Sequence, residues 1–142
     1  THRDIYDSPS IGGDNPGMQF DEHLARVGED HLWVAVLEDE VVGLTGIIPR
    51  DEGPEIEPVI VARSHRGQGI GEMLVRHLIA TVKDAGESTL SVSAVGRNSK
   101  ALGFYHAMGF RIVAYVELMQ DFKEDDRPWR EGDPLAGRTF YV

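Results

Sequence analysis

The stretch ARSHRGQGIGEML at residues 62–74 carries three glycines at alternate positions, directly after a basic run. The run EIEPVIV before it has the composition of a β-strand, and the residues after it repeat apolar side chains at helical spacing. Glycines at such a junction permit a tight turn and let a ligand approach the backbone closely. The stretch therefore predicts a strand, a glycine-rich turn and a helix in direct succession.

The turn has the composition of an anion site. The first amide groups of a helix have no acceptor within the helix, and the helix dipole adds positive potential at that end. Arg63, His65 and Arg66 add side-chain donors and positive charge. The combination suits a phosphate or pyrophosphate, although a turn that only packs the helix tightly against a sheet is an equally good interpretation of these glycines alone.

Two common nucleotide-binding motifs do not fit this turn. A Walker loop needs lysine and then serine or threonine after its last glycine, and here Glu72 follows Gly71. A dinucleotide-binding fingerprint needs a third glycine at the position of Leu74 and an acidic residue at the end of the next strand, which here ends in Val95 and Gly96. Both nucleotide hypotheses therefore fail at specific positions.

The rest of the chain predicts one mixed sheet with helices, the α/β (α+β) class. Strands are predicted over residues 31–39, 41–49, 55–62, 89–95, 111–122 and 137–142, and helices over residues 18–27, 70–85 and 98–108. A tight acidic turn joins the first two strands into a hairpin. The helix at 70–85 has the clearest apolar stripe, and Asn98 is a natural N-cap for the last helix.

Composition limits the function classes. A chain of 142 residues with 41% hydrophobic residues predicts a single domain over residues 1–142. The sequence has no apolar run near 18 residues, the length a membrane-spanning helix needs, and no leader pattern is visible. We therefore expect a cytoplasmic protein without a membrane partner. The net charge of −10 argues against nucleic acid as a partner. The absence of cysteine excludes disulfides and thiolate chemistry, and the scattered histidines predict no metal site.

The glycine turn resembles a known signature. RGQGIG is similar to the Q/R-x-x-G-x-G/A motif of the GNAT superfamily of acetyl-CoA-dependent N-acetyltransferases, with Arg66, Gly69 and Gly71 at the defining positions. The downstream segment NSKALGFYHAMGF is similar to the N-x-x-A-x-x-x-Y-x-x-x-G-F segment of the same family, with Asn98 and Tyr105 in place. Two motifs in the family's order make the resemblance specific, and it extends over roughly residues 32–122.

The resemblance implies a GNAT-like acyl-CoA N-acyltransferase fold. In that fold a central, mostly antiparallel sheet is flanked by helices, and its fourth and fifth strands splay apart. Residues 55–62 and 89–95 match those two strands. The chain departs from the family pattern before His31, where no opening strand is visible. The usual first strand is therefore expected to be missing, which leaves the acceptor side of the site undefined.

The resemblance also implies roles for single residues, with acetyl-CoA as co-substrate. Backbone groups of residues 59–61 would hold the pantetheine arm and polarise the thioester carbonyl, the glycine turn would cradle the pyrophosphate, and Tyr105 would protonate the departing thiolate. The implied cofactor-binding residues are Val59, Ile60, Val61, Arg66, Gly67, Gln68, Gly69, Ile70, Gly71, Asn98 and Tyr105.

Glu55 and Glu57 are the candidates for the base that deprotonates the amine. They lie two residues apart on one predicted strand, so both side chains project from the same face. Glutamate is depleted in strands, which calls for an explanation. One of them acts as base or amine anchor, or both lie on a solvated edge; Glu57 is preferred because it is nearer the thioester end.

The resulting prediction is an N-acetyltransferase that transfers the acetyl group of acetyl-CoA to a primary amine of a small molecule, peptide or protein by direct attack on the thioester. The alternative is a non-catalytic acyl-CoA-binding sensor on the same fold. Such a sensor could dispense with Tyr105 and both glutamates, and this chain has all three. Assembly as a homodimer is left open.

Overall fold

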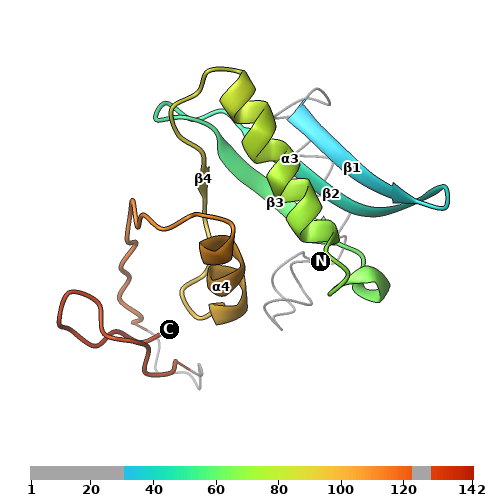
Figure 1. Ribbon diagram of the computed structural model, residues 1–142. Coiled ribbons are helices and arrows are strands. Elements are labelled where there is room, and N and C mark those ends of the chain that lie inside the picture. The colour runs from blue at the N-terminus through green and yellow to red at the C-terminus, as the bar shows by residue number, and fades with distance from the viewer. Residues whose placement is uncertain (1–30, 123–128) are drawn as a thin grey trace. The chain divides into compact units, whose positions relative to one another are not determined.

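The computed structural model describes residues 31–122 and 129–142, and its sheet has four strands in the order β1-β2-β3-β4 (Figure 1). The strands are β1 (Leu32–Leu37), β2 (Glu40–Ile48), β3 (Glu55–Val61) and β4 (Ser91–Val92). The first three are antiparallel neighbours, whereas β4 runs parallel to β3. This mixed sheet confirms the predicted α/β (α+β) class.

The acidic turn between β1 and β2 forms the predicted hairpin. Leu37 pairs with Glu40, so the loop consists of Glu38 and Asp39 alone. Both loop residues have positive φ, at 49° and 65°. Two successive residues with positive φ are typical of a type I′ turn, one of the two turn types that match the twist of the flanking strands.

Helix α3 (Ile70–Asp84) covers one face of the sheet (Figure 1). Its predicted stripe is buried, and the buried members are Leu74, Val75, Leu78 and Val82. A Cβ atom at Gly43 of β2 would lie 3.0 Å from both Ile70 Cγ2 and Leu74 Cδ1. The missing side chain at Gly43 therefore lets α3 approach the sheet closely. Gly86, with φ of 82°, follows the helix as predicted.

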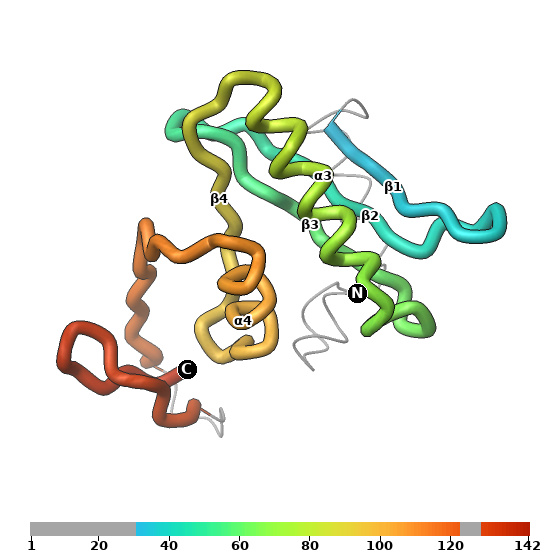
Figure 2. Tube along the Cα trace, viewed as in Figure 1, coloured from blue at the N-terminus to red at the C-terminus, as the bar shows by residue number. Residues whose placement is uncertain are grey.

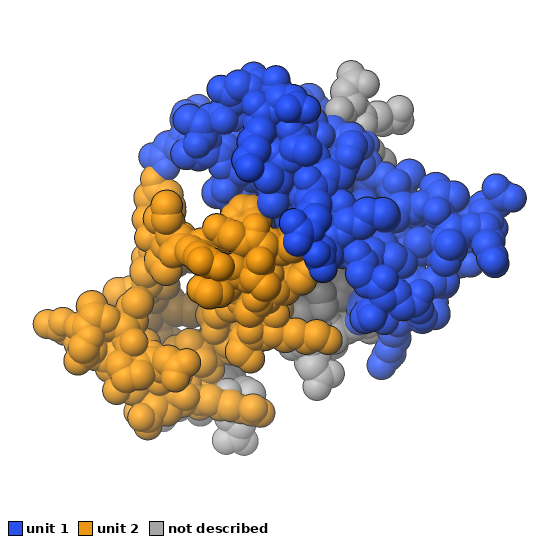
Figure 3. Space-filling model, in the orientation of Figure 1, with its two compact units in different colours: residues 1–93 blue, residues 94–142 orange. Residues whose placement is uncertain are grey.

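Residues 1–93 and residues 94–142 form two compact units, each described by itself (Figure 3). The second unit contains α4 (Ser99–Ala107), which begins as predicted, because the Ala101 N–H donates to Asn98 Oδ1 at 3.0 Å. A single domain over residues 1–142 stays a prediction. In the described part of the chain, no helix combines the length and apolar character needed to cross a membrane.

Three predicted strands differ from the structure. The strand expected over residues 89–95 is reduced to β4, and the strand expected over residues 111–122 is absent. Only the isolated bridges of Glu131 with Tyr141 and of Leu135 with Arg138 occur where a closing strand was expected. A strand needs a neighbour for its backbone groups, and no described strand pairs with residues 111–122, where Ile112 is 91% exposed. The helix and opening strand considered before residue 31 lie outside the described residues.

Candidate functional site

The glycine turn connects β3 to α3 through the short 3₁₀ helix η2 (Arg63–His65), and Figure 2 follows the chain along this path. Gly67 and Gly69 have φ of 76° and 84°, conformations that side chains rarely adopt. A Cβ atom on either one would meet no described atom within 4 Å. The backbone conformation therefore requires glycine here, and no described residue fills the space beside these two α-carbons.

The first turn of α3 directs amide groups toward this space. The first bond of the helix runs from the Met73 N–H to the Gly69 carbonyl, at 3.0 Å. The N–H groups of Ile70, Gly71 and Glu72 therefore have no acceptor within the helix. The Glu72 carboxylate would repel an anion, but it is bound by Arg76, with Nη2 at 2.8 Å from Oε1. The helix end keeps its capacity for a negatively charged group.

Arg66 ties the turn to the end of β3. Its Nε donates to the Val61 carbonyl at 3.0 Å, which leaves the other N–H groups of its guanidinium for a ligand. Gln68 Nε2 donates to the Ser64 carbonyl at 3.4 Å, and Ser64 Oγ lies 2.8 Å from His65 Nδ1. These local bonds order the turn, so Arg66 and Gln68 contribute to its shape as well as to its charge.

The register of β3 determines which of its backbone groups bond to β2 and which point to the opposite edge of the strand. The Ala62 N–H donates to the Val42 carbonyl at 2.8 Å, which makes Ala62 a hydrogen-bonded position in the pairing with β2. Hydrogen-bonded and non-hydrogen-bonded positions alternate in an antiparallel pair. Ile60 therefore bonds to β2, whereas the backbone groups of Val59 and Val61 point to the opposite edge. The bond from Arg66 to the Val61 carbonyl agrees with this assignment.

That opposite edge is covered only in part by β4. Among the described residues, β4 pairs with β3 at Glu55 and Ile56 and at no later residue of the strand. The edge at Val59 and Val61 lies beyond this pairing, in agreement with the predicted splay of the two strands. A bulge also interrupts β3 here, because Glu57 and Pro58 together lie opposite the single residue Gly46. Bulges commonly redirect side chains next to functional sites.

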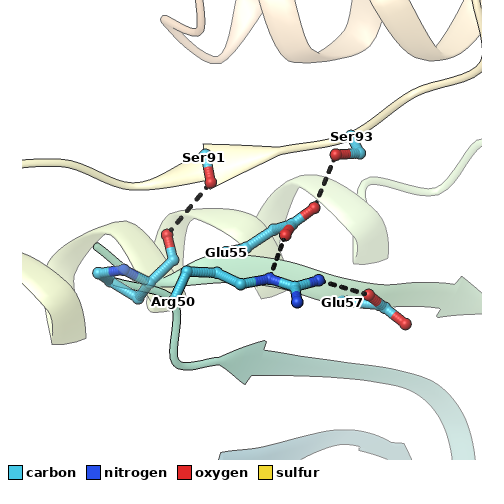
Figure 4. A network of polar contacts seen from close by, with 6 residues as sticks. Arg50, Glu55, Glu57, Ser91 and Ser93 are labelled. Atoms are coloured by element: carbon cyan, nitrogen blue, oxygen red, sulfur yellow. Dashed lines mark hydrogen bonds and ion pairs between the residues drawn. The ribbon is translucent and has the colours of Figure 1, made fainter. Parts of the chain in front are cut away.

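The two candidate glutamates meet at Arg50 (Figure 4). Arg50 Nε lies 2.7 Å from Glu55 Oε2, and Arg50 Nη2 lies 3.9 Å from Glu57 Oε2. Both carboxylates thus lie within reach of one guanidinium, and the prediction that they share one face of the strand stays a prediction. Their environments differ, because the side chain of Glu55 is 13% exposed and that of Glu57 is 41% exposed.

Glu55 is held in its charged form. Ser93 Oγ donates to Glu55 Oε1 at 2.7 Å, so each carboxylate oxygen has a donor. Burial raises the pKa of Glu55, but the hydrogen bonds from Ser93 and Arg50 and the positive charge of Arg50 outweigh it and hold the pKa below its usual value. A carboxylate with both oxygens engaged and a lowered pKa is a poor proton acceptor, which argues against Glu55 as the base.

Asn98 and Tyr105 belong to the second unit, residues 94–142. The side-chain oxygen of Asn98 caps α4, and this bond leaves its amide nitrogen as a donor for a cofactor. The Tyr105 ring packs edge-on against Phe104 and Phe110, with ring centroids 5.1 and 5.8 Å apart. The joining of these two residues with the glycine turn in one site stays a prediction.

The extent of a family match decides the classification. A family model described as the Acetyltransferase (GNAT) family matches residues 2–110, more than half of the chain. The chain belongs to the GNAT acetyltransferase family. The resemblance seen in the glycine turn and in the segment around Tyr105 is thereby confirmed.

Curated relatives of this GNAT chain carry acetyltransferase names. N-acetyltransferase 8B from Homo sapiens is 33% identical over 86 residues, which cover 56% of this chain and 38% of that protein. Peptidyl-lysine N-acetyltransferase YjaB from Salmonella typhimurium is 34% identical over 91 residues, 63% of this chain and 57% of that protein. The chain therefore spans well under two thirds of the length of these relatives.

A solved structure shows the same fold. A GNAT family acetyltransferase from Elizabethkingia anophelis, crystallised with acetyl-CoA bound, superposes with a TM-score of 0.63 at 24% identity, over 96% of this GNAT chain and 84% of that chain. The predicted GNAT-like fold is thus confirmed.

Arg50 and Ser93, the partners of Glu55, were not predicted from the sequence of this GNAT chain. An arginine five residues before a strand glutamate is a weak signal, and Ser93 had none, because it is 38 residues from Glu55. In the described residues, no group of three or more histidine, aspartate or glutamate side chains is arranged to hold a metal ion. The expectation of a metal-independent reaction stays a prediction.

Proposed function

We propose that this chain is an N-acetyltransferase that transfers the acetyl group of acetyl-CoA to a primary amine. The observation that carries the proposal is the junction of β3 and α3, where a sheet edge leads directly into a helix end and neither is covered by the residues that the structure describes. Family membership and the acetyltransferase names of the relatives support it. A cytoplasmic location, a homodimer and the absence of nucleic-acid or membrane partners stay predictions.

The junction suits two parts of acetyl-CoA, its pyrophosphate and its pantetheine arm. A pyrophosphate placed over Gly67 and Gly69 would accept from the first N–H groups of α3 and from the guanidinium of Arg66. The amide-containing pantetheine arm would add to the edge of β3 at Val59 and Val61, as an extended peptide adds to a sheet edge. The backbone of Ile60 bonds to β2, so the contribution of that residue would come from its side chain.

The chemistry assigns one task to each group. A lysine-type amine has a pKa near 10.4 and must lose a proton before it attacks the thioester. Glu57, directly or through a water, is the proposed acceptor of that proton. A backbone N–H on the edge of β3 would stabilise the negative charge that develops on the thioester oxygen. Tyr105 would donate a proton to the departing thiolate.

The proposed acceptor class is a primary amine on a small molecule, peptide or protein. The Salmonella relative is named for peptidyl-lysine, so a lysine-containing peptide is the first acceptor to test. The net charge of −10 agrees with a cationic acceptor. A chain that binds acetyl-CoA and transfers nothing to any amine would instead be an acyl-CoA sensor.

Acetyl-CoA binding is the first test, with calorimetry on the wild type, Gly69→Glu and Gly86→Glu. Both glycines have positive φ and no described atom within 4 Å of an added Cβ, so both variants carry the same strain and charge. They lie at opposite ends of α3. We expect Gly69→Glu to weaken binding by at least about tenfold, because a carboxylate would face the pyrophosphate, and Gly86→Glu to bind as the wild type does.

Two outcomes would contradict the proposal. If the folded wild type does not bind acetyl-CoA, the glycine turn serves only to pack the helix. If both variants lose binding equally, the pyrophosphate does not lie at Gly69.

Catalysis is tested separately with Tyr105→Phe, and Tyr141→Phe serves as control on an exposed tyrosine. Removal of a proton donor is expected to lower kcat by about 10²-fold, with the dissociation constant of acetyl-CoA unchanged. Steady-state kinetics with a lysine peptide measures both variants. An unchanged kcat in Tyr105→Phe would assign that ring to packing against Phe104 and Phe110.

A further inference from the structure

The point at which β3 and β4 part is weakly defined by the backbone. Their parallel ladder consists of two pairs, Glu55 with Ser91 and Ile56 with Val92. Parallel pairing is slightly less stable per residue than antiparallel pairing, and so short a ladder provides few bonds. Other contacts must therefore hold the two strands together before they diverge.

Polar bonds reinforce both ends of this ladder. Ahead of it, Thr89 Oγ1 donates to the Glu52 carbonyl at 3.0 Å, and at its first pair the Ser91 N–H donates to the Pro54 carbonyl at 3.0 Å. Just after it, Ser93 Oγ donates to Glu55 Oε1 at 2.7 Å. The bond between Ser93 and Glu55 thus lies just after the ladder, at the point of divergence (Figure 4).

The Glu55 carboxylate is well suited to serve as such a link. Its second oxygen accepts from Arg50 Nε at 2.7 Å, and its side chain is 13% exposed. Hydrogen bonds to an ionised carboxylate are shorter and roughly twice as strong as neutral ones. One half-buried carboxylate therefore joins the turn before β3, β3 itself and the chain just after β4.

We propose that Glu55 is a positioning residue, which together with Arg50 and Ser93 forms a clasp that determines where β3 and β4 part. The clasp holds β3 at Glu55, two residues before Glu57. The edge of β3 from Glu57 to Val61 is therefore left for the pantetheine arm. This inference rests on the proposed function. It divides the two glutamates by role: Glu55 orders the sheet, and Glu57 acts on the amine.

The test compares Glu55→Gln, Ser93→Ala and their double variant with Glu57→Gln and with Glu87→Gln, a variant of an exposed glutamate outside the clasp. Three quantities are measured in each: the acetyl-CoA dissociation constant, kcat for a lysine peptide, and the hydrogen-exchange rate of the Ser91 amide, which donates within the ladder. Ser93→Ala removes one bond only, so it carries the test if Glu55→Gln does not fold.

The clasp predicts that both of its single variants weaken acetyl-CoA binding by about tenfold or less and accelerate exchange at Ser91. The double variant should be little worse than Glu55→Gln alone, because that substitution already weakens the charge-assisted bond that Ser93→Ala removes. Glu57→Gln should lower kcat about 10²-fold without changing binding or exchange. Glu87→Gln should match the wild type in all three.

The clasp is overturned if Glu55→Gln lowers only kcat while Ser93→Ala behaves as the wild type, because Glu55 would then be the base. Additive effects of the two variants would also overturn it. Exchange at Ser91 is measured without ligand, so it decides the clasp even if the chain does not bind acetyl-CoA. Failure to bind acetyl-CoA would contradict the proposed function and not the clasp.

Discussion

Glu55 shows how one carboxylate links local chemistry to stability. Its pKa in the folded chain lies below the ordinary value, because the bonds from Ser93 and Arg50 and the charge of Arg50 outweigh the effect of burial. A lowered folded pKa means that the charged form is favoured in the folded state. The corresponding stabilisation is present above the pKa of the unfolded chain and is lost as the pH falls through the folded value.

This sign gives a pH prediction. Between about pH 6 and pH 3, the wild type is expected to lose more of its free energy of unfolding than Glu55→Gln does, because the variant has no carboxylate to protonate there. Urea unfolding at a series of pH values measures the difference. Glu57, which also faces Arg50, is present in both proteins and serves as the internal reference. Parallel pH profiles would show that the Glu55 ion pair contributes nothing to stability.

At the scale of elements, the course of β3 depends on a residue of its neighbour. Gly46 of β2 lies opposite the bulge formed by Glu57 and Pro58. A Cβ atom at Gly46 would lie 2.8 Å from the Glu57 carbonyl oxygen and 2.5 Å from Leu32 Cδ2. The bulge therefore requires a position without a side chain on β2. The shape of the β3 edge at Val59 and Val61 thus depends on the hairpin.

Gly46→Ala is expected to lower the free energy of unfolding by about 1–3 kcal/mol, because the backbone of β3 must shift to admit the methyl group. The same substitution at Gly103, inside α4 and with no described atom within 4 Å of the added Cβ, is expected to stabilise by about 0.5–1 kcal/mol. Urea unfolding of both variants gives the comparison. A neutral Gly46→Ala would mean that the two strands yield easily at the bulge.

At the scale of the whole molecule, the two family motifs lie in different compact units. If one acetyl-CoA contacts both, its binding free energy stabilises both, because a ligand that binds only the folded state adds to its stability. Acetyl-CoA is therefore expected to slow hydrogen exchange in residues 62–74 and also in residues 98–110. Gly69→Glu should show neither effect. Protection confined to residues 62–74 would remove Asn98 and Tyr105 from the site.

Much of the architecture follows from patterns of neighbouring residues. The hairpin, the stripe of α3 and the cap at Asn98 were predicted, because turn residues, helical spacing and capping oxygens act within a few residues of each other. The prediction of a strand over residues 111–122 was wrong, because it depended on contacts between residues far apart in the chain. Its apolar pattern is typical of a strand, but a strand also needs a partner, and composition does not reveal whether one exists.

The candidate site divides in the same way. The sequence predicted the glycine turn with its basic residues and the placement of Glu55 and Glu57 two residues apart on β3, because these features depend on spacing alone. The sequence already favoured Glu57 as the base, but the proposed positioning role of Glu55 could not be predicted, since it depends on Ser93, which is 38 residues from Glu55. Local conformation is set by residues adjacent in the chain, whereas charge state and edge exposure are set by residues that only folding brings together.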